Sequence, residues 1–115
     1  MTARRVPCEH RWDPAVLDGA LPRGASFSDL DAFAEIAGRF LFIERKPEGY
    51  AWDPGNGQYR ALRALSRLPG CTVWVIRPEA GGWQVRDLAH PGEVLWTADD
   101  ETLRQMVSGW AGAAA

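Results

Sequence analysis

Two apolar stretches separated by a glycine open the patterned part of the chain. Residues 31–37 and 40–46 are both mostly apolar, and Gly38 lies between them. Strand-like runs joined by a short connection that contains glycine are typical of a β-hairpin. The pattern therefore predicts an antiparallel pair of strands.

The next segment changes from strand spacing to helical spacing. Loop-forming residues dominate 47–57, and residues 58–68 then carry leucines three positions apart until Pro69 and Gly70 stop the pattern. Residues 72–76 form a continuous apolar run, which is typical of a strand buried on both faces. A strand, a helix and another strand in this order predict a crossover unit with parallel strands.

Two further strands and a helix complete the pattern. Residues 83–88 and 93–96 are predicted as edge strands around a turn at 90–92. A helix begins near Asp99, because the apolar residues that follow recur on one helical face. Residues 1–28 carry several Pro and Gly residues, so they predict a wrapped arm.

The length and the apolar content limit the chain to one domain. With 115 residues, of which 46% are hydrophobic, it can build one compact core. We expect an α/β domain with an N-terminal arm at 1–28, a core motif region at 29–77, and edge strands and a C-terminal helix at 83–112. Its mixed central sheet would contain the hairpin, the crossover helix and the parallel strand.

Charge and cysteine content exclude several classes of function. The formal net charge of −2 gives no general attraction to nucleic acid or membranes, so DNA contacts must come from local arginine clusters. No stretch approaches the roughly 20 apolar residues of a membrane span or resembles a signal peptide, and we expect a cytoplasmic protein without a membrane partner. Cys8 and Cys71 suggest no disulfide framework, and Cys8 with His10 lacks the companion pair of a zinc site.

The most informative chemistry lies at the end of the second hairpin strand. Lys46 is the only lysine among thirteen basic residues, and it follows Glu44 by two positions, so both side chains project from the same face. A tight turn pairs Phe33 with Phe42 and places Asp31 opposite Glu44, about 5 Å away. Facing carboxylates favour a cation, and Mg²⁺ takes one or two carboxylates with waters and phosphates. Lys46 would then orient or deprotonate the metal-bound water.

Gln58 is a polar residue on a face that must pack against the sheet. Helical spacing puts it within about 40° of Leu62 and Leu65. An inward amide needs a hydrogen-bond partner. Either Gln58 reaches the charged end of the hairpin, or it bonds to backbone in the first helical turn.

Two groups of residues are candidates for binding nucleic acid. Arg60, Arg63 and Arg67 cluster within about 60° of arc on the helix, as a phosphate-binding surface beside the carboxylates or as a solvated face. Tyr50 and Trp52, in the loop that precedes the helix, either stack on unpaired bases or pack the loop against the core.

The pattern Asp31-x12-Glu44-x-Lys46, on a hairpin followed by a helix and a parallel strand, resembles the PD-(D/E)XK nuclease superfamily. The likeness covers roughly residues 27–77. It is greatest to small Holliday-junction resolvases and to phage-encoded and VRR-NUC-type nucleases. The composition, with arginine in place of lysine and many Ala and Gly residues, is typical of a GC-rich genome and favours a bacterial or phage source.

The resemblance implies a restriction-endonuclease-like fold and a Mg²⁺ or Mn²⁺ cofactor. In that family the ion is bound by residues equivalent to Asp31, Glu44 and the carbonyl of Arg45. The resemblance also implies that Lys46 assists the attack of water on a phosphodiester and that Gln58 faces the site.

Some residues depart from the family pattern. Leu30 stands where the family usually has Pro, and the arm replaces a long N-terminal helix that carries an acidic residue, for which Glu9 is the only stand-in. Asp29 competes as the first carboxylate, or pairs with Lys46 across the hairpin. A plainer interpretation is that the carboxylates and the lysine form a charge-balanced strand edge.

Two classes of function therefore remain open. The first is a Mg²⁺-dependent nuclease that acts on DNA, as a homodimer because so small a fold offers one cut per subunit. The second is a non-catalytic member of the fold that binds nucleic acid or a protein partner, such as a phage regulator or inhibitor. The complete set of site residues favours the first, whereas the acidic balance and the missing N-terminal helix favour the second.

Overall fold

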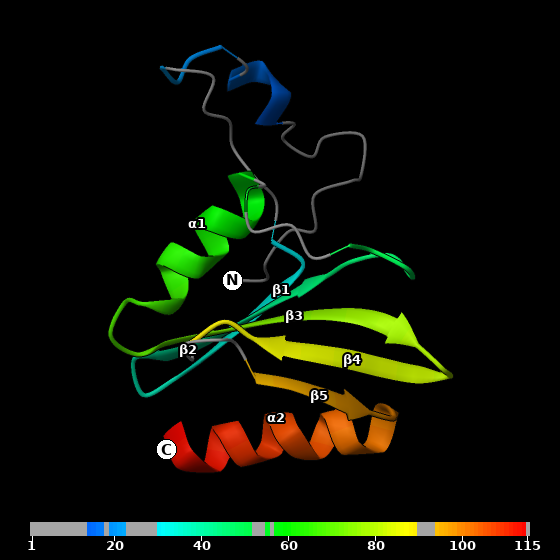
Figure 1. Ribbon diagram of the computed structural model, residues 1–115. Coiled ribbons are helices and arrows are strands. Elements are labelled where there is room, and N and C mark those ends of the chain that lie inside the picture. Colours follow the sequence, from blue (N-terminus) through cyan, green and yellow to red (C-terminus); the bar gives the residue numbers. More distant parts are fainter. Residues whose placement is uncertain are drawn as a thin grey trace, which may run out of the picture.

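The computed structural model describes residues 14–17, 19–22, 30–51, 55, 57–89 and 94–114, which form a mixed α/β fold (Figure 1). Its elements are η2 (Pro14–Leu17), β1 (Ala32–Ile36), β2 (Arg39–Arg45), α1 (Gly57–Ser66), β3 (Cys71–Glu79), β4 (Gly82–Asp87), β5 (Val94–Ala98) and α2 (Asp100–Ala114). Within these residues one five-stranded sheet has the order β1-β2-β3-β4-β5. Strands β2 and β3 are parallel, and the other neighbours are antiparallel.

The hairpin of β1 and β2 has the expected register, with Phe33 opposite Phe42. Ala37 and Gly38 connect the strands with φ angles of 53° and 82°. Two successive residues in the left-handed region characterise a type I′ turn. The twist of this turn matches that of the two strands it joins. Asp31 and Lys46 lie one residue outside the strands, where the expected strands had included them.

The crossover from β2 through α1 to the parallel strand β3 is also confirmed. Helix α1 ends at Ser66, earlier than expected, because the next two amides bond back only three residues and tighten the chain. Strand β3 extends beyond the predicted 72–76, since it pairs with β4 as far as Glu79. The buried run Val73–Ile76 lies at its centre, as its apolar pattern predicts.

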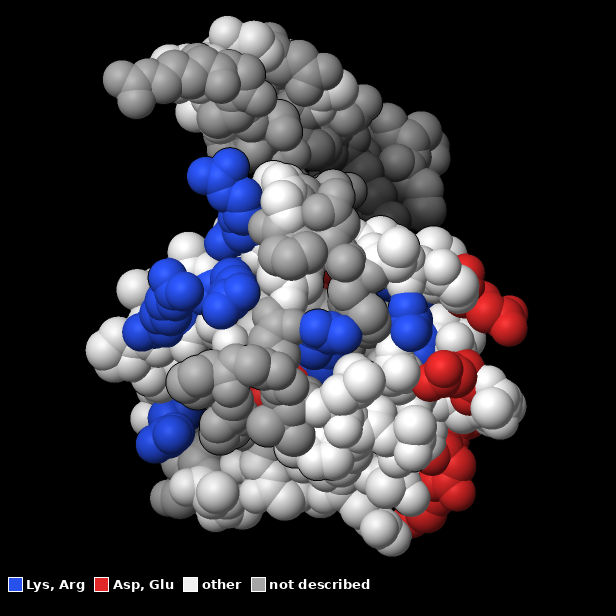
Figure 2. Space-filling model, viewed as in Figure 1, with Lys and Arg blue, Asp and Glu red and all other residues white. Residues whose placement is uncertain are grey.

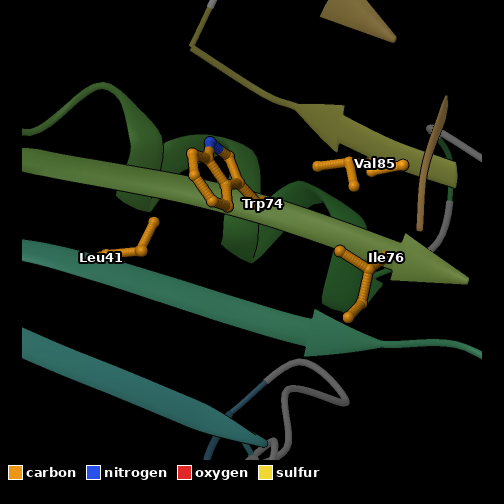
Figure 3. Packing of buried hydrophobic residues seen from close by; sticks show 5 residues of the cluster. Leu41, Trp74, Ile76 and Val85 are labelled. Atoms are coloured by element: carbon orange, nitrogen blue, oxygen red, sulfur yellow. The ribbon is translucent and has the colours of Figure 1, made fainter. Parts of the chain in front are cut away.

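The sheet carries one helix on each face, α1 on one and α2 on the other (Figure 1). The core on the α1 face is formed by Tyr59, Leu62, Val73, Val75 and Leu88. The core on the α2 face is formed by Leu41, Trp74, Ile76, Val85 and Ala98 (Figure 3). Alternate residues of β2 and β3 therefore enter opposite cores, and every even-numbered residue of β2 faces α1.

Strand β4 lies inside the sheet and is not an edge strand, contrary to expectation. It pairs with β3 on one side and with β5 on the other, so the two edges are β1 and β5. Helix α2 follows β5 directly, and Asp99 caps it by accepting a 2.7 Å hydrogen bond from the Thr102 amide. None of the described helices combines the length and apolar character needed to span a bilayer.

Several expected features lie outside the described residues. Most of the arm at 1–28 is among them, as are Cys8, Glu9 and His10. The same holds for Asp29 and Trp52, and for the expected turn at residues 90–92.

Candidate active site at the end of strand β2

Glu44 is a buried carboxylate on the α1 face of the sheet. It pairs with Val75 of β3 and is only 6% exposed. Its Oε1 accepts a 3.1 Å hydrogen bond from Nε2 of Gln58, whereas its Oε2 is buried without a hydrogen-bond partner among the described residues. Leaving a buried carboxylate oxygen unpaired is costly. Oε2 is therefore a position where a cation would be stabilising.

Gln58 joins Glu44 to Lys46. The Lys46 ammonium donates to the amide oxygen of Gln58 and lies 3.7 Å from Oε1 of Glu44. Of the two arrangements expected for Gln58, the structure has the one in which the amide reaches the charged end of the hairpin. The amide oxygen of Gln58 accepts the hydrogen bond from Lys46, and the amide nitrogen donates the one to Glu44.

Lys46 is further held by the loop after β2. Its backbone amide donates to Ile76 at 2.8 Å, and its ammonium lies 5.2 Å from the centre of the Tyr50 ring. Arg77 on β3 donates to the Tyr50 carbonyl and so fixes the loop. Sequence reasoning missed Arg77, because its partner lies 27 residues away with no local pattern to connect them.

Asp31 lies across the hairpin from this group. It is exposed, and its Oδ2 accepts a 2.7 Å hydrogen bond from the backbone amide of Arg45. Continuing the β1–β2 register by one residue places Asp31 opposite Glu44. The pKa of Glu44 is raised above its ordinary value, first by burial and then by the negative charge of Asp31, while Lys46 partly offsets both effects.

The backbone and the side chain of Arg45 have different surroundings. The guanidinium lies on the opposite face of the sheet, 5.5 Å from the centre of the Trp83 ring. Only backbone atoms of Arg45 therefore belong to the Asp31 side of the hairpin. A carbonyl ligand role for Arg45 does not involve its positive charge.

The residues present fit part of a Mg²⁺ site. Among the described residues, no group of three or more His, Cys, Asp or Glu side chains is placed to hold a metal ion. Two carboxylates are nevertheless sufficient for Mg²⁺, which keeps several waters and uses substrate phosphate oxygens as ligands. Asp31, Glu44 with its unpaired Oε2, and the Arg45 carbonyl would supply a donor set of this kind. Cys71, a half-buried free thiol, lies at the other end of β3.

The arginine cluster lies apart from the carboxylates. At 100° per residue, Arg60 and Arg63 are about 160° and 140° around the axis of α1 from Gln58, and Arg67 follows the end of the helix. They therefore occupy the opposite flank of the helix rather than the position expected beside the carboxylates. Figure 2 shows basic side chains gathered over α1 on the left and acidic ones on the right.

Comparison with known proteins gives no assignment: no family model matches the chain, and neither a curated protein nor a solved structure is significantly similar to it.

Proposed function

We propose that the protein is a metal-dependent phosphodiesterase that hydrolyses nucleic acid, with a PD-(D/E)XK-type site on a restriction-endonuclease-like fold. The observation that carries the proposal is Glu44. A carboxylate buried to this degree, tied by Gln58 to the only lysine of the chain and with one oxygen left without a hydrogen-bond partner among the described residues, is costly to keep for packing alone. A buried carboxylate with perturbed ionisation beside a lysine is instead typical of a catalytic site.

The chemistry follows from the residues. Asp31, Glu44 and the Arg45 carbonyl would hold Mg²⁺ or Mn²⁺, which when bound makes water a stronger nucleophile and offsets phosphate charge. Lys46 would orient or deprotonate the attacking water and stabilise the negative charge that develops on the phosphate. Gln58 would hold the Lys46 ammonium next to the Glu44 carboxylate, since it forms hydrogen bonds with both.

The topology supports the same assignment. The carboxylates and the lysine lie at one end of a hairpin, and a crossover helix and a parallel strand follow it. This order matches the arrangement that the sequence resemblance implies for residues 27–77. A homodimer and a phage origin remain predictions.

The decisive experiment is cleavage by the purified protein. Supercoiled, branched and single-stranded DNA would be incubated with Mg²⁺ or Mn²⁺, alongside Glu44→Gln, which keeps the shape of the side chain and removes its charge. We expect cleavage by the wild type, none in EDTA and none by the variant. Equal cleavage by both proteins would indicate a contaminating nuclease and refute the proposal.

A second candidate is a non-catalytic binding module of the same fold. Two observations favour it: Glu44 and Lys46 already form an ion pair, and Arg60 and Arg63 lie on the opposite flank of α1. On this hypothesis the wild type binds nucleic acid or a protein partner without cutting DNA under any metal condition. The same cleavage assay, combined with a binding assay, separates the two functions.

A further inference from the structure

Three phenylalanines form a row on the α1 face of the hairpin. Phe33 on β1 lies opposite Phe42 on β2, with ring centres 6.0 Å apart. Phe40 stacks on Phe42 at 5.7 Å with an interplanar angle of 8°. Phe33 is 67% exposed although it is a large apolar side chain. A ring supported on one side and open on the other is suited to contact a ligand.

The row continues directly from the candidate active site. Phe33 follows Asp31 by two residues and Phe42 precedes Glu44 by two, so the rings and the carboxylates share one face. Two residues along a strand correspond to about 7 Å. A group that leaves the carboxylates along the hairpin therefore meets the open face of Phe33 first.

We propose that Phe33 stacks on an unpaired base next to the phosphodiester held at Asp31 and Glu44, which makes single-stranded or frayed nucleic acid the substrate class. This inference rests on the proposed function. Inside a duplex the base faces are covered by neighbouring base pairs, whereas an unpaired base can offer its π-face to an aromatic ring. The ring of Tyr50, by contrast, lies against Lys46.

The charges around Phe33 favour contact with a base over contact with the backbone. Asp31 and Glu35 flank the ring on the same face, and Glu35 is oriented toward the turn by a 2.7 Å hydrogen bond from the Gly38 amide. A carboxylate without a bound cation, such as Glu35, repels phosphates but accepts hydrogen bonds from the amino groups of bases. The phosphate backbone of the bound nucleic acid would therefore run on the Lys46 side, away from Glu35.

Binding without cleavage tests the inference. A labelled single strand of mixed sequence and a blunt duplex of equal length would be titrated with Ca²⁺, which takes carboxylate oxygens as ligands, in place of Mg²⁺ or Mn²⁺, and followed by fluorescence anisotropy. We expect Phe33→Ala to weaken single-strand binding about tenfold, since one base stack carries roughly that factor. Phe33→Tyr should restore it. Trp96→Ala removes an aromatic side chain of 38% exposure on β5, the other sheet edge, and should bind like the wild type.

Each outcome is informative. If Phe33→Ala binds the single strand as tightly as the wild type, or if the wild type prefers the blunt duplex, the inference is overturned, while Glu44-dependent cleavage would keep the proposed function. If single-strand binding depends on Phe33 but no DNA is cut, the stacking surface is supported and the catalytic proposal fails. Because Phe33 is exposed, Phe33→Ala and Phe33→Tyr should melt like the wild type, which circular dichroism checks.

Discussion

Gln58 donates a 3.1 Å hydrogen bond to Glu44 and accepts one from Lys46, so a neutral amide bridges the carboxylate and the lysine. The bridge ties the first turn of α1 to the end of β2. It also satisfies only one oxygen of Glu44 and leaves Oε2 buried without a partner among the described residues. The arrangement orients a charge pair and at the same time leaves one carboxylate oxygen without a hydrogen-bond partner among the described residues.

The first prediction concerns metal binding. If Asp31 and Glu44 share an ion, Mg²⁺ or Mn²⁺ at about ten times its Kd should stabilise the fold by ~1.4 kcal/mol and raise Tm by several degrees. Glu44→Ala should abolish the shift. Glu35→Ala removes an exposed carboxylate on the Asp31 face and should keep the shift. Equal shifts in wild type and Glu44→Ala, measured by thermal melting, would rule out this metal site.

The second prediction concerns pH. The pKa of Glu44 is raised by burial and by Asp31, so its ionised form is disfavoured in the folded state. Glu44 therefore contributes stability below the ordinary glutamate pKa of about 4.3, and loses it as the pH rises through the folded-state pKa. In EDTA, Glu44→Gln should be more stable than the wild type at neutral pH by a few degrees in Tm. The difference should shrink toward pH 4, and a difference that is constant across pH would contradict the raised pKa.

The sequence predicts the hairpin register well, for a physical reason. A two-residue turn fixes the pairing of the strands, and the alternation of side chains then fixes which residues share a face. For this reason residue spacing alone is enough to bring Asp31, Glu44 and Lys46 together. Helical spacing likewise suffices to put Gln58 on the sheet-facing side of α1.

Other features depend on contacts that sequence spacing does not report. The inner position of β4 follows from pairing with β5, which is a tertiary choice and not a property of either strand. The fixing of Tyr50 by Arg77 spans 27 residues and has no local signature. The position of Arg60 and Arg63 relative to Gln58, in contrast, follows from helix geometry alone.

The third prediction concerns two glycines with opposite surroundings. A Cβ at Gly82 would lie 2.5 Å from the Ala98 carbonyl oxygen, whereas a Cβ at Gly109 in α2 would meet nothing within 4 Å. Gly82→Ala should therefore destabilise the fold by about 1–3 kcal/mol. Gly109→Ala should stabilise it by up to about 1 kcal/mol through helix propensity. Urea unfolding measures both values, and a neutral Gly82→Ala would show that β4 and β5 do not approach this closely.

The fourth prediction concerns the chemical role of Lys46. Because arginine keeps the positive charge, Lys46→Arg should keep the fold and the metal-dependent Tm shift. Arginine is larger, however, and does not readily release a proton. The variant should lose cleavage by about 100-fold or more. Arg45→Lys is the matched control, because that side chain lies over Trp83 on the other face, and it should cut normally. If Lys46→Arg cuts at the wild-type rate, Lys46 acts only as a charge.

The last prediction concerns Arg60, Arg63 and Arg67. With a net charge of −2, the chain can hold DNA only through a local basic surface, and the arginines over α1 are the described candidate. Replacing all three with Gln should leave stability nearly unchanged, since exposed charges contribute little. DNA binding should weaken, and the slope of log K against log salt should fall by roughly one unit for each lost phosphate contact.

Arg104→Gln, on the exposed side of α2, is the control and should keep the wild-type slope. An unchanged slope in the triple variant would mean that DNA enters elsewhere, for example along Arg4, Arg5 and Arg11, which lie outside the described residues. Because Arg60 and Arg63 lie across the helix from Gln58, the triple variant should weaken binding without changing the cleavage rate of bound DNA. A loss of cleavage at saturating DNA would instead place these arginines at the reacting phosphate.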